Sequence, residues 1–189
     1  MPDEPEALGL LALMLLHDSR RYVRIGRDGQ LVLLDDQDRS RWDRSAIERG
    51  LGLLNRARRL GPPGPYVLQA AIAGEHARAR RAADTDWRSI AALYAGLSAI
   101  AASPVVELNR AVAVAMAGDV AAGLGMVDGI AEAGALDGYH LLHSARADLL
   151  RRLGRSGEAA AAYRRALELA TNPVERTFLR KRLAEVTQG

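Results

Sequence analysis

Residues 153–169 read LGRSGEAAAAYRRALEL, and this stretch decides the fold class. A glycine near its start ends one helical segment, and a run of alanines then leads to one bulky side chain, Tyr163. Small residues let two helices approach closely, and a single large side chain fills the space that remains between them. The stretch is therefore typical of the second helix of a packed helical hairpin.

The same pattern occurs once more upstream, at a spacing of 36 residues. When Gly118 is aligned with Gly154, the paired positions are Ala111 with Ala147, Val114 with Leu150, Gly123 with Ala159, Val127 with Tyr163, and Ile130 with Ala166. The spacing is close to the roughly 34 residues of a tetratricopeptide (TPR) helical hairpin. The sequence thus predicts an all-α fold built as a TPR-like helical-hairpin solenoid.

Helix start and stop signals extend this prediction to the whole chain. We expect helices at about residues 5–21, 43–60, 66–80, 87–101, 104–117, 119–133, 138–153, 156–170 and 173–187. The Pro-Pro-Gly-Pro segment at 62–65 is the expected boundary between two domains. We expect residues 1–62 to form an N-terminal helical subdomain with a long ordered acidic loop, and residues 63–189 to form TPR-like repeats with a C-terminal capping helix.

The first expected helix is apolar around almost its whole circumference, so it is either buried on most sides or faces a partner. After it, Asp28-Gly29 is a turn signal, and its flanks form either a small hairpin or an ordered loop. In the second part, the hairpin at 66–101 is a divergent repeat in which Tyr94 takes the bulky position.

Composition limits the classes of protein to consider. The 189 residues include no cysteine and carry a formal net charge of +3. Disulfides and thiolate metal sites are excluded, and the scattered arginines give little indication of nucleic-acid binding. The most apolar run, residues 7–16, is shorter than the roughly 20 residues that span a bilayer, and acids precede it. We expect a cytoplasmic protein with no membrane partner.

The segment at 34–43 (LDDQDRSRWD) has the densest set of side chains with specific hydrogen-bonding geometry. A metal site could use Asp35, Asp36 and Asp38, but EF-hand spacing and a nearby histidine are missing. A structural clasp would satisfy these acids with arginines, cap the next helix and bury Trp42. A docking surface would use tryptophan and arginine as anchors. The residue types alone do not decide between a structural clasp and a docking surface.

Motifs of catalysis are not found in the sequence. It contains no Gly-x-Ser-x-Gly, no phosphate-binding loop and no Gly-x-Gly-x-x-Gly. His140 and His143 are spaced as zinc ligands could be, but a packing role is favoured because no acidic motif accompanies them. We therefore expect no enzyme activity, no catalytic residue, no metal and no cofactor.

Six motifs follow one another along essentially the whole chain: 5–18 (PEALGLLALMLLHD), 33–43 (LLDDQDRSRWD), 64–66 (GPY), 83–87 (ADTDW), 103–113 (SPVVELNRAVA) and 138–143 (GYHLLH). Together they resemble the C-terminal extension of one group of extracytoplasmic-function (ECF) RNA polymerase sigma factors. In that group a TPR-like domain follows a compact sigma factor and is thought to control it in place of a membrane anti-sigma factor. We expect this chain to be the extension alone.

The resemblance implies contacts with sigma domains 2 and 4 of the full-length protein and with core RNA polymerase. DNA would be contacted only through the sigma domains, and a YCII-related (DGPF-type) protein, a common genetic neighbour of the group, is a further candidate partner. The expected partner-binding residues are Asp35, Asp36, Asp38, Arg39, Arg41 and Trp42, with a second patch at Asp84, Asp86, Trp87, Asn109 and Arg110.

An alternative function uses the groove of the solenoid. Asn109 and Arg110 stand on the helix that lines such a groove, where an amide and a guanidinium could hold a peptide or carboxylate. A small-molecule or peptide sensor would bind near Asn109, His143 and Arg146.

Overall fold

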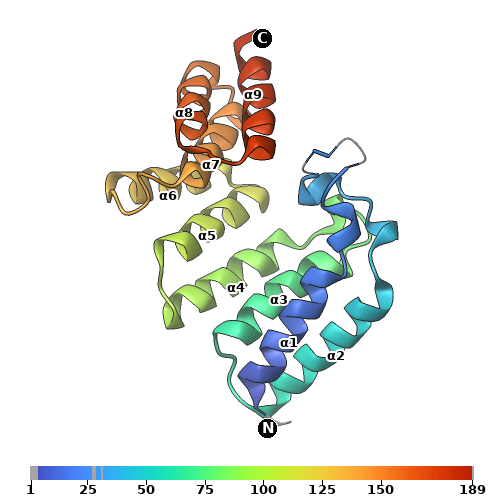
Figure 1. Cartoon of the computed structure of the whole chain (residues 1–189). Coiled ribbons are helices and arrows are strands. Elements are labelled where there is room, and N and C mark those ends of the chain that lie inside the picture. Colours follow the sequence, from blue (N-terminus) through green and yellow to red (C-terminus); the bar gives the residue numbers. More distant parts are fainter. Residues whose placement is uncertain (1–3, 27–28, 31, 189) are drawn as a thin grey trace. The chain divides into compact units, whose positions relative to one another are not determined.

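The computed structural model describes residues 4–26, 29–30 and 32–188, and this part of the chain is all-α (Figure 1). Its helices are α1 (Pro5–Asp18), α2 (Arg44–Leu60), α3 (Pro65–Arg78), α4 (Trp87–Ile100), α5 (Pro104–Met116), α6 (Val120–Glu132), α7 (His140–Arg152), α8 (Ser156–Leu169) and α9 (Pro173–Gln188). Single 3-10 turns occur at η1 (Arg21–Val23), η2 (Leu34–Asp36), η3 (Arg39–Arg41) and η4 (Ala82–Asp84). The predicted all-α fold is confirmed.

The chain forms two compact units that divide between Ala102 and Ser103. The first contains α1 to α4, and the second contains α5 to α9. The boundary expected at residues 62–65 falls inside the first unit, because α3 packs against both α1 and α2. The Pro-Pro-Gly-Pro segment separates two helices of one core.

Helix α3 is joined to α1 at its N-terminus. The Glu6 carboxylate accepts hydrogen bonds from the backbone nitrogens of Tyr66 (2.8 Å) and Val67 (3.2 Å). These are amides that the start of a helix leaves without an intrahelical partner. The two helices also approach closely at Gly9, where a Cβ atom would lie 2.7 Å from the Val67 nitrogen. These contacts attach α3 to the N-terminal subdomain.

The second unit contains the predicted repeat as two hairpins, α5 with α6 and α7 with α8. Gly118 and Gly154 follow α5 and α7 with φ values of 117° and 72°, a region that side chains disfavour. At the matched interior positions Val127 is 0% exposed and Tyr163 is 1% exposed. Helix α9 packs against α8 through the buried Leu179.

The segment between α1 and the acidic loop doubles back on itself. The Gly26 nitrogen donates to the Gln30 oxygen (2.8 Å), and the Val32 nitrogen donates to the Arg24 oxygen (3.0 Å). Asp28 of the expected turn lies outside the described residues, while Gly29 has a φ of 74°. Among the residues that the structure describes, no helix is long and apolar enough to cross a membrane.

Candidate docking surface

The acidic segment at 34–43 forms the turns η2 and η3 and leads directly into α2. Its side chains divide into two sets by exposure. Asp35, Asp36, Asp38 and Arg41 are exposed, whereas Gln37, Arg39 and Trp42 are buried. The residues expected to bind a partner together thus lie partly on the surface and partly inside the first unit.

Arg39 closes the C-terminal end of α3. Its Nη1 donates to the carbonyl oxygens of His76 (2.9 Å) and Ala79 (3.1 Å), and its Nη2 donates to the Thr85 hydroxyl (3.3 Å). The C-terminus of a helix leaves carbonyl groups unpaired and carries partial negative charge. A guanidinium donates hydrogen bonds to these carbonyls, and its positive charge is attracted to the negative end of the helix. Arg39 is only 3% exposed, so this is a structural clasp between the acidic segment and α3.

Trp42 packs beneath this clasp. Its side chain is 3% exposed and lies in a core cluster with Leu16, Val23 and Ile47. The guanidinium carbon of Arg39 lies 5.1 Å from the centre of the Trp42 ring, within the range of a cation–π interaction. Neither residue is available to a partner in this conformation, so the buried half of the segment is structural.

Aspartates of the segment differ in what they do. Asp38 accepts hydrogen bonds from the Ser40 nitrogen (3.0 Å) and hydroxyl (2.6 Å), and these bonds hold the pKa of its carboxyl below the usual value. Asp43 caps α2 by accepting from the Ala46 nitrogen (3.0 Å). Asp35 and Asp36 project from η2 with exposed side chains. These two are the acids best placed to meet a partner.

A group of cations surrounds the clasp. Arg24 donates to the His17 carbonyl at the end of α1 (3.0 Å), and Arg20 lies 3.2 Å from the His17 ring nitrogen Nδ1. Burial and the charges of Arg24 and Arg39 lower the pKa of Arg20 to about 10. Burial, followed by Arg39, Arg20 and His17, lowers the pKa of His76 to about 4. His76 is therefore neutral near pH 7.

Three of the five residues of the second expected patch, Asp84, Asp86 and Trp87, lie in the first unit with the first patch. The Asp84 carboxylate pairs with Arg81 through two hydrogen bonds of 3.0 and 2.8 Å, and Asp86 caps α4 at the Ser89 nitrogen (2.9 Å). The Trp87 ring meets the His76 ring edge-on, with centroids 5.1 Å apart. Turns η2 and η4 are in contact, so the carboxylates of the two patches occupy one region of the first unit.

The positive charge of Arg39 interacts with an aspartate from each patch. Burial lowers the pKa of its guanidinium, while the negative charges of Asp35 and Asp84 act in the opposite direction. We call Asp35, Asp36, Asp38 and Asp84, together with Arg41, the acidic face. Among the described residues, no group of three or more histidine, cysteine or acidic side chains could hold a metal ion.

Asn109 and Arg110 belong to the second unit, on α5. Asn109 is exposed, and Arg110 lies 3.3 Å from Glu107 in an ion pair. The other two residues expected in a ligand groove make structural contacts. His143 Nε2 lies 3.0 Å from the Asp137 carbonyl oxygen, and Arg146 pairs with Asp128 across α6 and α7 at 2.6 Å.

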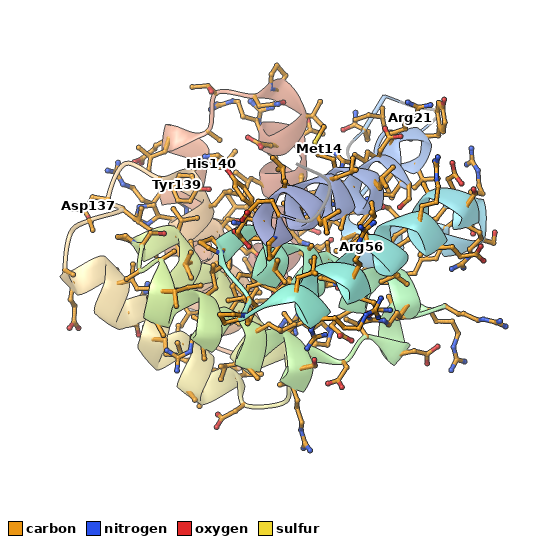
Figure 2. The ribbon with its side chains drawn as sticks, turned by 90° about the horizontal axis from the view of Figure 1, so that it is seen from below. Met14, Arg21, Arg56, Asp137, Tyr139 and His140 are labelled. Carbon is orange, nitrogen blue, oxygen red and sulfur yellow. The ribbon has the colours of Figure 1, made fainter. Side chains whose placement is uncertain are left out.

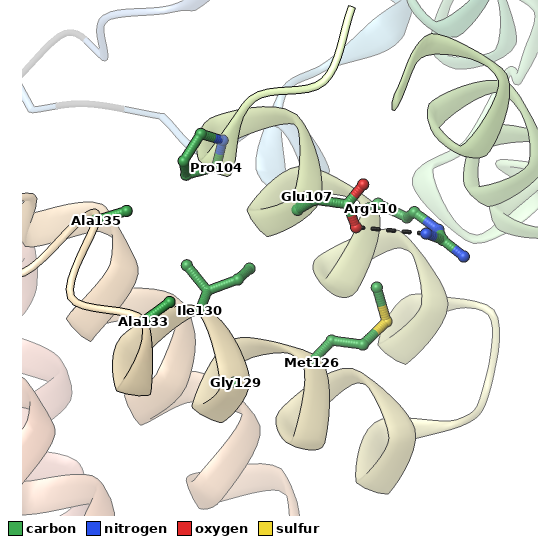
Figure 3. Close-up of a pocket in the computed structure, with 8 residues that line it drawn as sticks. All are labelled: Pro104, Glu107, Arg110, Met126, Gly129, Ile130, Ala133 and Ala135. Carbon is green, nitrogen blue, oxygen red and sulfur yellow. Dashed lines mark hydrogen bonds and ion pairs between the residues drawn. The ribbon is translucent and has the colours of Figure 1, made fainter. Parts of the chain in front are cut away.

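A shallow groove of about 470 Å³ does lie between α5 and α6 (Figure 3). Met126 and Ile130 point from α6 toward α5, and the Glu107–Arg110 pair borders them. The remaining lining residues are Pro104, Gly129, Ala133 and Ala135. Of the candidate binding residues expected from the sequence, Arg110 is the one that lines this groove.

Comparison with known proteins places the acidic segment inside a recognised stretch. Residues 1–58 match a Family of unknown function (DUF6596). The chain is also similar to Uncharacterized protein R00370 of Rhizobium meliloti (strain 1021), with 47% identity over 182 residues. That match covers 96% of this chain and 43% of the relative, so the chain spans less than half of the relative's length. No solved structure matches the chain.

Three contributors to the first unit were not anticipated as tethers from the sequence. Glu6 holds the start of α3, Arg24 closes the end of α1, and His76 packs on Trp87. The acid at the start of α1 and the arginines after its end were visible, but helix-dipole arguments assign them to their own helix. Glu6 and Tyr66 are 60 residues apart and leave no local signal, and the pairings of Arg24 with His17 and of His76 with Trp87 join separate elements across loops.

Proposed function

We propose that this chain is the regulatory, protein-interaction region of an ECF sigma factor. It modulates the start of transcription through contacts with sigma domains 2 and 4 or with core RNA polymerase, and it acts in the cytoplasm, where the polymerase works. The observation that carries the proposal is the acidic face, whose exposed carboxylates stand on a clasp fixed from below by Arg39 and Trp42.

Charge complementarity explains why such a face suits these partners. Proteins that read DNA present basic surfaces to the phosphate backbone, and an acidic surface attracts the same groups. Because Arg39 fixes the segment, little conformational entropy is lost when a partner binds the exposed aspartates. The acidic face therefore favours contact with a basic protein surface over contact with DNA.

The extent of the matched relative is also in keeping with a multi-domain protein. More than half of the relative lies outside the region that matches this chain. That length leaves room for further domains, and the motifs at 5–18, 33–43 and 103–113 resemble those that follow sigma domains. The proposal assigns the remaining length to the two sigma domains.

Reading the complete open reading frame and reconstituting transcription test this function. The complete polypeptide, with core RNA polymerase, is expected to start transcription at a specific promoter. Deleting residues 1–189 of this region should raise or lower the promoter-specific output. A reading frame without sigma domains, or equal output with and without the region, would contradict the proposal.

A ligand sensor is the second candidate, favoured by the groove between α5 and α6. Its apolar floor and charged border suit a small amphipathic molecule or a peptide side chain. In a thermal-shift screen of the 189-residue chain with cell-extract metabolites, a bound metabolite should raise the melting temperature if this function holds. Gly129→Leu should abolish that rise, because a Cβ at Gly129 meets open space and a larger side chain would fill the groove.

A further inference from the structure

The groove between α5 and α6 has an apolar floor that the core of the second unit leaves partly open. Met126 and Ile130 are partly buried, and they pack against that core while also lining the groove (Figure 3). Gly129 lies beside Ile130 on α6, and a Cβ atom there would meet nothing within 4 Å. The groove volume of about 470 Å³ is near the lower end of the range for ligand pockets. The floor therefore suits a small ligand with an apolar part.

An ion pair on α5 borders this floor. Arg110 Nη1 and Glu107 Oε2 lie 3.3 Å apart, and the two side chains are 38% and 31% exposed. The pair Arg155–Glu158 has the same spacing in the chain and is shorter, at 2.7 Å. A long ion pair that is open to solvent contributes little to stability. A ligand can therefore place its own charges against the two side chains at small cost.

Both members of the pair can bind more than one partner at a time. A guanidinium has five N–H donors, and a carboxylate has about four acceptor sites. The hydrogen bond from Arg110 to Glu107 uses one donor and one acceptor site. Because the two opposite charges stand side by side, they match a ligand that carries a carboxylate and an ammonium group on neighbouring atoms.

A ligand with a single charge fits this border less well. A carboxylate without an ammonium group would be attracted by Arg110 and repelled by Glu107, and an amine without a carboxylate would meet the reverse. An α-amino acid has both charges at one end and its side chain at the other. An apolar α-amino acid therefore matches the ion pair with its charged end and the floor with its side chain.

We propose that the groove between α5 and α6 binds a free α-amino acid whose apolar side chain is about the size of leucine. Arg110 donates to the α-carboxylate, Glu107 accepts from the α-ammonium group, and the side chain lies on Met126 and Ile130. Methionine is unbranched and flexible, so the floor adapts to several apolar side chains. The inference names the ligand class for the second candidate function, ligand sensing, and rests on it.

NMR titration of the isotope-labelled 189-residue chain with L-leucine tests the site. The backbone amide signals of Arg110, Gly129 and Ile130 should shift and saturate. A ligand of about ten non-hydrogen atoms in a shallow groove is expected to have a dissociation constant of about 1 mM. Isoamylamine lacks the carboxylate of leucine, and isocaproate lacks its ammonium group. Each should bind about tenfold more weakly than leucine, because one charge of the pair is left unmatched.

Substitutions of the ion pair test the assigned roles. Arg110→Met and Glu107→Gln should each weaken leucine binding about tenfold. Arg164→Met, at an exposed arginine on α8 outside the groove, is the matched control and should bind leucine as the wild type does. Amide signals of α8 and α9 that stay in place show that each variant remains folded.

Three results would overturn the proposal. They are the absence of shifts at about 10 mM L-leucine, ten times the expected dissociation constant, equal affinity for leucine and for isoamylamine or isocaproate, and unchanged affinity in folded Arg110→Met. In each case the thermal-shift screen separates the ligand class from the function. A metabolite that stabilises the wild type and not Gly129→Leu would keep ligand sensing and replace its ligand class, whereas a screen without any stabilising metabolite would remove both.

Discussion

Arg39 and Arg176 play the same structural role at the C-terminal ends of two helices. A single nitrogen, Nη1, donates to two carbonyls at the end of α3. Arg176 repeats the arrangement at the end of α8, where its Nη1 donates to the Leu167 (2.6 Å) and Ala170 (2.8 Å) oxygens. Both helices end in an extended alanine instead of a glycine, so the arginine satisfies carbonyls that a glycine turn would otherwise pair.

Replacing Arg39 should destabilise the first unit. Arg39→Met leaves the His76 and Ala79 carbonyls without a donor and removes the cation on Trp42, and we expect a loss of about 2–4 kcal/mol in the free energy of unfolding. Both tryptophans lie in the first unit, so fluorescence during urea unfolding reports on it.

The matched control is Arg41→Met, two residues further on and exposed. It should change the free energy of unfolding by less than about 0.5 kcal/mol. Equal effects of the two substitutions would show that Arg39 has no special structural role.

His76 should make the first unit sensitive to acid. Its folded-state pKa of about 4 lies below the unfolded value of 6.5, so the unfolded chain takes up the proton first as the pH falls. The stability due to neutral His76 is fully present above pH 6.5 and is lost as the pH falls toward 4. The expected loss is about 2 kcal/mol between pH 7 and pH 5.

His76→Phe keeps an aromatic ring against Trp87 and removes the titration. The difference in unfolding free energy between wild type and His76→Phe, measured by urea titration, should therefore shift by that amount over the same interval. His17 and Arg20 are unchanged in both proteins, which cancels their contribution. Parallel pH profiles would contradict the burial of a neutral His76.

At the scale of helices, glycines decide how closely α1 and α3 approach. Gly9→Ala places a Cβ 2.7 Å from the Val67 backbone nitrogen, so one helix must move, at a cost of about 1–3 kcal/mol. Gly52→Ala on α2 is the matched control, because a Cβ there meets open space. It should stabilise the protein by about 0.5–1 kcal/mol through helix propensity. Urea unfolding that gives both substitutions the same sign would rule out this account.

Helices and hairpins could be predicted because their signals are local. Capping aspartates such as Asp86 and Asp119, and the glycines Gly118 and Gly154, lie within one turn of the helix ends that they define. The division into units could not be predicted in the same way. It depends on Glu6 reaching Tyr66 and on Arg39 reaching Ala79, which no spacing rule connects.

The sequence predicted which residues make up the candidate site, but not which of their side chains are buried and which are exposed. The sequence marked residues 34–43 as special and left clasp and docking surface open. The structure shows Arg39 and Trp42 buried in a clasp and Asp35 and Asp36 exposed, so a docking role stays a prediction for the exposed acids. Alternation of buried and exposed side chains in 3-10 turns follows from tertiary contacts, so the residue types alone could not assign it.

At the scale of the whole molecule, the first unit combines two surfaces of different character. One is the acidic face on η2, η3 and η4, and the other is the set of exposed apolar side chains Leu10, Leu11 and Met14 on α1 (Figure 2, where Met14 is labelled). In the proposed function the acidic face contacts a sigma domain or the polymerase.

The most direct test of the central claim neutralises the acidic face without touching the clasp. Asp35→Asn with Asp36→Asn is introduced into the complete polypeptide, and promoter-specific transcription with core RNA polymerase is measured beside the melting temperature of this region. Glu132→Gln, an exposed acid of α6, serves as the control for loss of charge elsewhere. We predict a severalfold change in output with an unchanged melting temperature. Unchanged output, or a change that follows unfolding of the region, would contradict the account.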